Sequence, residues 1–341
     1  MIAGHLIQTR HPVVAIVGPT AIGKSHIGIE VAKRLQTEVL TADSRQVYRE
    51  MDVGTDKPTL SEQQGVPHRL IDLVNPDQPF NTGDFKLAAI AEIARLHQAG
   101  KIPLVIGGTG LYVRALLRGL CPGPPADWTL RKQLAADAAQ HGPQFLFRQL
   151  QQVDPVLAKR LHPNDQPKIQ RALEVFTILG KPFSEVQAEH QFSERPYPFL
   201  LIGLTMDRAT LYKRIESRVE LEIEKGLVQE TQRLLDRGYS RELGSMKGLG
   251  YKQFSGYLAG EYSYDEAIRI LKRDTRHFAK RQMTWFGKEP DLQWLSIDPP
   301  DLPDRAASWI IDRIIHFLKS LETTTFMSPA PLVHSKKWRC D

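Results

Sequence analysis

Gly18-Pro19-Thr20-Ala21-Ile22-Gly23-Lys24-Ser25 is the most informative segment of the chain. It follows the apolar run Val13–Val17 and precedes a helical pattern that continues to about Leu35. A strand, a glycine-rich loop and a helix in this order fit the phosphate-binding pattern G-x-x-x-x-G-K-[ST]. In such a loop the backbone N–H groups and the positive end of the helix hold phosphate oxygens. Lys24 would add a positive charge and Ser25 a hydroxyl for Mg²⁺, so the segment predicts a site for a phosphate or a diphosphate.

The composition is that of a globular protein with a basic charge balance. Of the 341 residues, 41% are apolar and 25% are charged, and the formal net charge is +6. This charge favours a polyanionic partner but does not require one. Cys121 and Cys340 are too few for a disulfide framework or a cysteine zinc site, and the histidines show no paired metal-ligand spacing. Met1–Pro12 does not resemble a signal peptide and no apolar run has membrane-spanning length, so we expect a cytoplasmic protein with no membrane partner.

Short apolar strands alternate with helical patterns, as in an α/β protein built on a parallel sheet. Beside Val13–Val17, the predicted strands are Glu38–Ala42, Pro103–Ile106, Phe199–Leu204 and an edge strand at Leu292–Leu295. The predicted helical regions are Asp84–Gln98, Gln170–Leu179, Ala209–Arg237, Gln253–Leu258, Asp265–Phe286 and Arg305–Leu321. With the phosphate-binding loop after the first strand, this order predicts a P-loop NTPase-like core.

A proline-rich break at Cys121–Ala126 marks a predicted domain boundary. From Trp128 to about His190 the pattern is helical without strands, which predicts an inserted all-helical lobe over residues 126–194. Residues 12–125 and 195–320 would then form the P-loop core with its C-terminal helices. Residues 322–341 carry threonine repeats and no periodicity, so we expect a disordered tail there.

Polar residues follow two of the predicted strands, at the edge where open α/β sheets bind their ligands. Asp43 comes directly after Glu38–Ala42. It could cap a following helix or accept a proton beside the phosphate, and its position fits both roles equally well. Gly107–Tyr112 follows Pro103–Ile106, and no acidic residue ends that strand. The Mg²⁺ carboxylate of motor ATPases is therefore missing there, which weakens that interpretation.

The predicted helix Asp265–Phe286 carries one basic face. Its members, at steps of four, three and four, are Arg269, Arg273, Arg276 and Lys280. A solvated face is the ordinary explanation for such a pattern. Acidic residues at helical spacing are nearly absent and aromatic residues interleave, which favours contact with the phosphates and bases of RNA. Arg218, in the preceding helical region, is ambiguous because Arg214 and Glu222 lie on the same face.

With these residues on the page, the chain resembles the tRNA dimethylallyltransferase family, also called tRNA isopentenyltransferases. The resemblance covers roughly Val13 to Leu295 and rests on several motifs in order. They are GPTAIGKS at Gly18–Ser25, DSRQVY at Asp43–Tyr48, MDVGTDKP at Met51–Pro58, PHRLID at Pro67–Asp72, GGTGLY at Gly107–Tyr112, RALEV at Arg171–Val175, GLGYKQ at Gly248–Gln253 and AKRQMTWF at Ala279–Phe286. Two positions depart from the family pattern: Ile22 stands where Ser is usual, and Gly287 stands where Arg is common.

The resemblance implies transfer of a dimethylallyl group from dimethylallyl diphosphate to the exocyclic amine of the adenosine immediately 3′ of the anticodon in tRNA. It assigns catalysis to Asp43, Thr109 and Arg218, diphosphate binding to Gly18–Ser25, and a Mg²⁺ contact to Ser25. The tRNA contacts that it implies are Asp43, Ser44, Arg45, Gln46, Thr109, Arg131, Pro167, Lys168, Ile169, Gln170, Arg171, Lys247, Gly248, Leu249, Gly250, Tyr251 and Lys252. The basic face adds Arg273 and Lys280. We expect a monomer that binds the anticodon stem-loop.

The chemistry explains these roles. An adenine amine is a poor nucleophile because its lone pair is delocalised into the ring, so Asp43 would take its proton as the C–N bond forms. Thr109 would orient the amine or a leaving oxygen. Lys24, Arg218 and Mg²⁺ would stabilise the charge that grows on the departing diphosphate. The adenosine would have to leave its stack to enter a channel.

Two alternatives remain. A P-loop kinase of a nucleotide or small metabolite would share Gly18–Ser25 but would not need the basic face or Lys247–Lys252. A non-catalytic RNA-binding protein would use the basic surfaces but would leave Asp43 and the loop unexplained. Enzymes that prenylate free adenine nucleotides are similar in chemistry, and the expected RNA-contacting surface argues against them.

Overall fold

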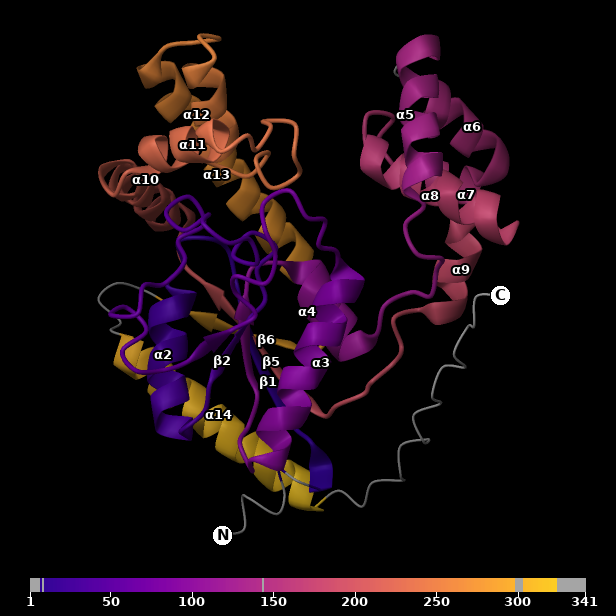
Figure 1. The fold of residues 1–341 in the computed structure, drawn as a ribbon. Helices are drawn as coiled ribbons and strands as arrows, with labels where there is room; N and C mark the ends of the chain where they lie inside the picture. Colours follow the sequence, from indigo (N-terminus) through magenta and orange to yellow (C-terminus); the bar gives the residue numbers. More distant parts are fainter. Residues whose placement is uncertain (1–6, 8, 143, 298–302, 324–341) are drawn as a thin grey trace. The chain divides into compact units, whose positions relative to one another are not determined.

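A six-stranded parallel sheet forms the centre of the larger part of the molecule (Figure 1). The computed structural model describes residues 7, 9–142, 144–297 and 303–323. The strands, in chain order, are β1 Val13–Val17, β2 Val39–Thr41, β3 His68–Arg69, β4 Leu104–Gly107, β5 Phe199–Thr205 and β6 Leu292–Ser296. Their order in the sheet is β3-β2-β4-β1-β5-β6. The predicted α/β class with a parallel sheet is confirmed, including the edge strand β6.

The helices of this part follow the strands along the chain. They are α2 Lys24–Leu35, α3 Thr82–Gln98, α4 Gly110–Arg118, α10 Arg208–Glu224, α11 Leu227–Asp236, α12 Tyr251–Leu258, α13 Tyr264–Phe286 and α14 Pro303–Thr323. Alternate residues of the central strand β1 serve opposite faces of the sheet. Val14 and Ile16 pack with α2 and α14, whereas Val13, Ala15 and Val17 pack with α3 and α4 (Figure 1). All five are buried, as expected for a strand covered on both faces.

Several elements differ from their predicted ends. Helix α3 begins at Thr82 rather than Asp84, because Asn81 and Asp84 form a capping box. The predicted region Ala209–Arg237 is two helices, α10 and α11, since Gly226 adopts φ +98° between them. The two-residue strand β3 and helix α4 were not predicted. Of the predicted tail at 322–341, residues 322 and 323 instead complete α14, and the rest lies outside the described residues.

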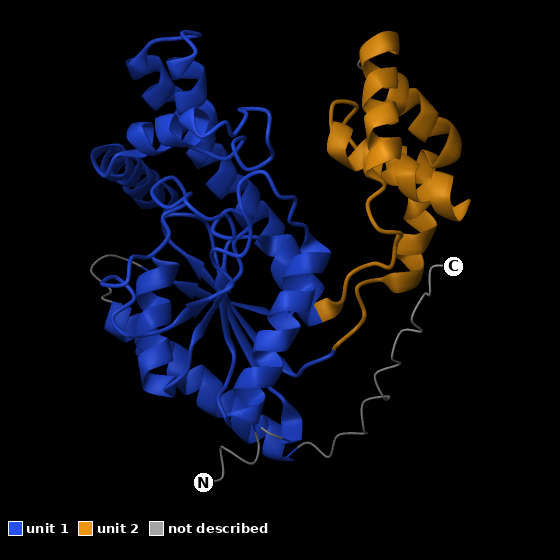
Figure 2. Ribbon diagram, in the orientation of Figure 1, with its two compact units in different colours: residues 1–117, 196–341 blue, residues 118–195 orange. Residues whose placement is uncertain are grey.

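Residues 118–195 form a second compact unit, and residues 1–117 with 196–341 form the first (Figure 2). The helices of the second unit are α5 Trp128–His141, α6 Phe145–Val153, α7 Pro155–Ala158, α8 Gln166–Leu179 and α9 Phe183–His190. They share an apolar core of their own, which includes Leu146 and Leu150. Asp154 caps α7 and binds the backbone N–H and hydroxyl of Ser184. Within the described parts of both units, no helix has the length and apolar content that crossing a bilayer requires.

The carboxyl ends of β2, β4 and β1 lie next to one another, because the three strands are parallel neighbours. Gly107 pairs with Val17 at the end of β4. A Cβ on Gly107 would lie 2.0 Å from the carbonyl oxygen of Ala42, just after β2. The obstacle is backbone, so only glycine allows the two strand ends to approach this closely.

We predict that Gly107→Ala lowers the apparent free energy of unfolding by about 2–4 kcal/mol, because the added methyl group must push the ends of β2 and β4 apart. Urea denaturation of the purified protein measures this quantity. Gly244→Ala is the matched control, since a Cβ there meets nothing within 4 Å. The control should change stability by less than about 0.5 kcal/mol. Equal stability of the two variants would contradict this description of the strand ends.

Candidate active site

The loop between β1 and α2 has the backbone geometry of an anion-binding cradle. Gly23 adopts φ +100°, which L side chains rarely do, and α2 begins directly after it at Lys24. A Cβ on Gly18 would lie 3.0 Å from the carbonyl oxygen of Leu204 in β5. The two glycines therefore let the loop turn in front of the first N–H groups of α2. Those groups lack intrahelical acceptors and attract anions.

A narrow cavity of about 80 Å³ lies beside this loop. Its walls come from the loop, the ends of β2 and β4, the segment after β2, and helices α10 and α13. The polar and charged residues that line it are Thr20, Lys24, Ser25, Thr41, Asp43, Gln46, Thr55, Asp56, His68, Arg218 and Gln282. Its apolar lining includes Phe278, Val39 and Ile106. The structure thus brings Asp43 and Arg218 to the phosphate loop, although 175 residues separate them in the chain.

Gln282 on α13 joins the phosphate loop to the loop after β4. Its Oε1 accepts a hydrogen bond from the backbone N–H of Thr20 (2.8 Å), and its Nε2 donates to the carbonyl oxygen of Gly108 (3.0 Å). Sequence reasoning missed this residue, although it belongs to the motif AKRQMTWF. The available signal was a polar residue on the buried face of α13, spaced three and seven residues after Ala279 and Thr275.

Arg218 on α10 reaches the same loop. Its Nη1 donates to the Thr20 hydroxyl at 2.8 Å and lies 3.4 Å from a carboxylate oxygen of Asp56. Its Nε donates to Glu222 at 2.7 Å, so the pairing that the sequence left ambiguous does form. Burial opposes the charge, but Glu222 and Asp56 hold the pKa of the Arg218 guanidinium above its usual value. Arg218 therefore presents a permanent positive charge at the phosphate loop.

Lys24 differs from Arg218 in that its charge depends on pH. Its Nζ donates to the carbonyl oxygen of Pro19 at 2.8 Å. Burial lowers the pKa of the Lys24 ammonium to about 8; the carboxylate of Asp43 opposes this shift and Arg218 adds to it. Lys24 is therefore charged at neutral pH and loses its charge under mildly alkaline conditions.

Asp43 begins a turn and not a helix. Its Oδ1 accepts a hydrogen bond from the backbone N–H of Arg45 at 2.8 Å, and the following residues continue in turns. The alternative that Asp43 caps a helix is therefore wrong. Thr109 lies beside this turn, because its Oγ1 accepts a hydrogen bond from the backbone N–H of Ser44 at 3.0 Å. The ends of β2 and β4 thus hold Asp43 and Thr109 close to each other at the cavity.

A buried carboxylate holds the wall of the cavity that follows β2. Glu230 on α11 is 3% exposed and accepts hydrogen bonds from the three backbone N–H groups of residues 52–54. It also accepts one from the hydroxyl of Tyr251 at 2.6 Å. The chain then continues to Thr55, whose carbonyl oxygen accepts a hydrogen bond from the Gln46 amide. This network fixes the motif MDVGTDKP as a wall of the site.

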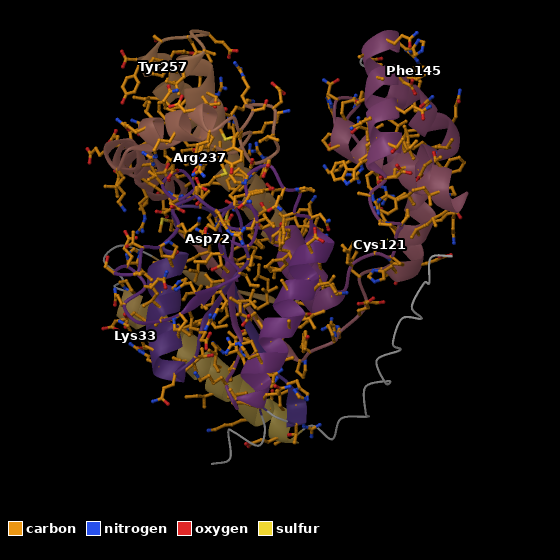
Figure 3. All side chains as sticks on the ribbon, viewed as in Figure 1. Lys33, Asp72, Cys121, Phe145, Arg237 and Tyr257 are labelled. Carbon is orange, nitrogen blue, oxygen red and sulfur yellow. The ribbon has the colours of Figure 1, made fainter. Side chains whose placement is uncertain are left out.

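Lys57 closes the same wall. Its side chain is 6% exposed, and its ammonium group contacts the carboxylates of Asp52 and Asp72 and donates to the carbonyl oxygen of Tyr48 at 2.9 Å. Asp72 is labelled in Figure 3, among the crowded side chains near the carboxyl edge of the sheet. A lysine satisfied by two carboxylates and a carbonyl group has a structural role, so we assign Lys57 to the wall.

The residues predicted to contact tRNA belong to both units. In the first unit, Lys247 and Lys252 are exposed. Tyr251 is 1% exposed, and Ile169 in the second unit is fully buried. Neither of these two can present its side chain to RNA, which leaves that role to the exposed members such as Arg131.

The basic face of α13 is more strongly paired than its sequence indicates. The expectation that acidic partners are nearly absent is wrong, because neighbouring residues and α10 provide them. The pairs are Arg269–Glu266, Arg273–Asp274 and Arg276–Glu216. Lys280 has no carboxylate partner among the described residues and lines a second cavity of about 590 Å³. Arg114, Arg281, Trp285 and Lys288 line it too, so the unneutralised positive charge lies toward the C-terminal end of α13.

Oxygen ligands for a Mg²⁺ ion lie in the small cavity. Ser25 stands at the start of α2, and the carboxylates of Asp43 and Asp56 line the same cavity. Mg²⁺ prefers such oxygens and commonly takes few ligands from the protein and the rest from phosphate and water. No group of three or more His, Cys, Asp or Glu in the described ranges is arranged to hold a metal ion. A bound diphosphate would therefore have to complete the coordination.

This geometry defines a P-loop α/β protein whose site is built for a phosphorylated substrate. The chain belongs to the IPP transferase family, whose model matches residues 46–289. It is 47% identical over 304 residues to the "tRNA dimethylallyltransferase 2" of Geotalea uraniireducens, which covers 89% of this chain and 96% of that protein. It is 48% identical over 283 residues to the tRNA dimethylallyltransferase of Syntrophobacter fumaroxidans, with 83% of each chain covered.

Solved structures agree with these relatives. The full-length tRNA isopentenylpyrophosphate transferase of Bacillus halodurans is 39% identical and superposes with a TM-score of 0.68, covering 92% of this chain and 98% of that one. A eukaryotic dimethylallyltransferase acting on tRNA is 27% identical, with a TM-score of 0.77 over 91% of this chain and 79% of that one. The family that the motifs predicted is confirmed.

The pKa of Lys24 gives a test of the phosphate loop. We predict that affinity for inorganic diphosphate falls by roughly tenfold between pH 7 and pH 9.5, because the ammonium group loses its charge as the pH rises through about 8. Isothermal titration calorimetry measures this affinity. Lys24→Ala should bind weakly at both pH values, and it controls for titration of the ligand. An equal pH dependence in the two proteins would show that Lys24 does not hold the diphosphate.

The bridge made by Gln282 gives a second test. Gln282→Ala should weaken diphosphate binding by roughly tenfold, because two buried hydrogen bonds that position the loop are lost. Gln253→Ala is the matched control. Gln253 is also buried and also makes two such bonds, with the Gly250 N–H and the Asp274 carboxylate, and it does not line the cavity. Both variants should lose similar stability. A similar loss of diphosphate affinity in both would contradict the positioning role of Gln282.

Proposed function

We propose that the protein transfers the dimethylallyl group of dimethylallyl diphosphate to the exocyclic amine of the adenosine 3′-adjacent to the anticodon in tRNA. One observation carries the proposal: the phosphate loop, Arg218 and Asp43 line a single cavity. Diphosphate binding, charge stabilisation and proton removal can therefore act on one pair of substrates. Membership of the family and the activity named for its relatives support the choice of these substrates.

The diphosphate would bind at the loop. Its oxygens would accept hydrogen bonds from the first N–H groups of α2 and from Lys24, while Arg218 would turn from the Thr20 hydroxyl toward the leaving oxygen. Mg²⁺ held with the help of Ser25 would neutralise further charge on the diphosphate. These groups are most effective as the C–O bond breaks, because the negative charge on the diphosphate grows in the transition state.

The amine would meet the allylic carbon on the Asp43 side of the cavity. As the new C–N bond forms, the electron pair of the breaking C–O bond goes to the diphosphate, and a proton of the amine goes to the Asp43 carboxylate. The hydroxyl of Thr109 lies beside the Asp43–Ser44 turn and would orient the amine. Phe278 and Ile106, which also line the cavity, would face the apolar dimethylallyl chain.

RNA would approach through exposed basic residues. We assign this role to Lys247 and Lys252, and to the C-terminal part of α13, where Lys280 lines the larger cavity. Phosphate contacts of this kind make binding depend strongly on salt. We propose that a single copy of the chain acts on each anticodon stem-loop, since the residues that line the small cavity all come from one chain.

A reaction with isotopically labelled dimethylallyl diphosphate tests this proposal. Label should enter an anticodon stem-loop that has adenosine 3′ of the anticodon, and it should not enter the same RNA with guanosine at that position. Parallel reactions with labelled ATP and small acceptors test the kinase alternative, for which no observation in the cavity argues. Transfer of the ATP γ-phosphate without prenyl transfer would overturn the proposal.

Asp43→Asn tests the proton acceptor. Asparagine retains the Oδ1 that accepts the Arg45 N–H, so the turn and the fold should persist. Turnover in a single-turnover assay should fall by about 10²–10⁴-fold, because the amide cannot accept the proton. Asp56→Asn removes another carboxylate from the same cavity and should keep turnover within about tenfold of the wild type. Near-normal turnover of Asp43→Asn would exclude Asp43 as the base.

A further inference from the structure

A buried carboxylate in the second unit binds two of the arginines predicted to contact tRNA. Glu174 on α8 is fully buried. Its Oε1 accepts from Nε of Arg131 at 2.9 Å, and its Oε2 accepts from Nη2 of Arg131 at 2.8 Å and from Nη1 of Arg171 at 2.5 Å. Burial favours the neutral form, but the hydrogen bonds from Arg131 and Arg171 hold the pKa of the Glu174 carboxyl below its usual value. The group is therefore an anion between two cations.

The contacts fix both guanidinium groups while leaving part of each accessible. Arg131 binds Glu174 through two of its five N–H groups, and its guanidinium lies 5.1 Å from the ring centre of Trp128. Arg171 also donates through Nη2 to the carbonyl oxygen of Pro124 at 2.9 Å. The side chains of Arg131 and Arg171 nevertheless remain 29% and 30% exposed. Each arginine is thus held from the inside, with its outer edge toward solvent.

Stability alone is a weak explanation for this arrangement. A buried ion pair loses hydration energy, and apolar residues of similar volume often stabilise a protein equally well. Here one buried carboxylate also faces two arginines, which leaves an excess positive charge at a partly exposed position. A phosphate could neutralise that excess and use the remaining N–H groups.

We propose that Glu174 is a positioning residue for tRNA binding, which holds Arg131 and Arg171 in one orientation with their outer N–H groups presented to RNA phosphates. The inference rests on the proposed function, since it takes RNA as the substrate. Without Glu174, both side chains would sample many rotamers, and each would have to be ordered again when RNA binds.

The sign of the expected effect separates positioning from simple electrostatics. Glu174→Gln removes a negative charge from a surface that binds a polyanion. If only net charge mattered, RNA would bind more tightly to the variant. If Glu174 positions the two arginines, RNA binds more weakly despite the added positive charge.

The experiment compares steady-state kinetics of full-length wild type and Glu174→Gln with an anticodon stem-loop. We expect KM for the RNA to rise by roughly tenfold, as for loss of a charge-assisted contact. We expect kcat and KM for dimethylallyl diphosphate to stay within about twofold of wild type. Asp154→Asn is the matched control, because Asp154 is also a buried carboxylate of this unit and binds Leu157 and Ser184 rather than arginine. It should lower the melting temperature and leave KM for the RNA unchanged.

Further variants keep the outcome decisive. Glu174→Asp keeps the charge on a shorter side chain; it should give an intermediate KM, and it replaces Glu174→Gln if that variant does not fold. Arg131→Ala and the Arg131→Ala/Glu174→Gln double variant should have similar KM values, because Glu174 acts through the arginines. An unchanged or lower KM in Glu174→Gln, with a raised KM in Arg131→Ala, overturns the positioning role alone. Absence of RNA prenylation by the wild type overturns the proposed function instead.

Discussion

The hydrogen bonds of one buried glutamine fix the relative position of the two loops that form the active cavity. Gln282 accepts from the backbone of Thr20 and donates to the backbone of Gly108, and it comes from α13, far along the chain from both. Through Thr20 it places the loop that Arg218 contacts. Through Gly108 it places the end of β4, where Thr109 meets the turn at Asp43. The basic helix that we propose for RNA binding is therefore also a structural part of the diphosphate site.

The charges of the cavity are arranged for a ligand that brings negative charge. Lys24 and Arg218 face the carboxylates of Asp43 and Asp56 across a small space. Burial depresses the pKa of Lys24, which shows that the cavity holds one more cation than its own anions fully stabilise. A diphosphate would reverse that balance. The same groups would then bind the leaving group more strongly as its charge develops, which is the condition for catalysis.

The sequence allowed the sheet and the phosphate loop to be predicted because their signals are local. Val13–Val17 and the glycines after it specify a strand and a tight turn within a few residues. Gln282 and Glu230 could not be predicted in the same way, since their partners lie 262 and about 177 residues away and depend on tertiary packing. The pairing of Arg276 with Glu216 was missed for the same reason, because Glu216 lies on another helix.

The roles of individual residues also depended on local chemistry that periodicity does not show. An aspartate after a strand is compatible with a helix cap or a turn, and only the backbone after Asp43 distinguished them. Tyr251, in a glycine-containing basic segment, looked accessible from the sequence, yet its hydroxyl is bound to a buried glutamate. The family resemblance supplied the substrates, and the structure supplied the reasons why particular groups can act on them.

The most direct measurement is a crystal structure of the protein with a non-transferable analogue of dimethylallyl diphosphate and an anticodon stem-loop. The account predicts the diphosphate on the backbone N–H groups of Thr20–Ser25, with Arg218 on the leaving oxygen. It places the adenine amine between the allylic carbon and the Asp43 carboxylate. A diphosphate bound elsewhere, or an adenine amine out of hydrogen-bonding reach of Asp43, would contradict the account.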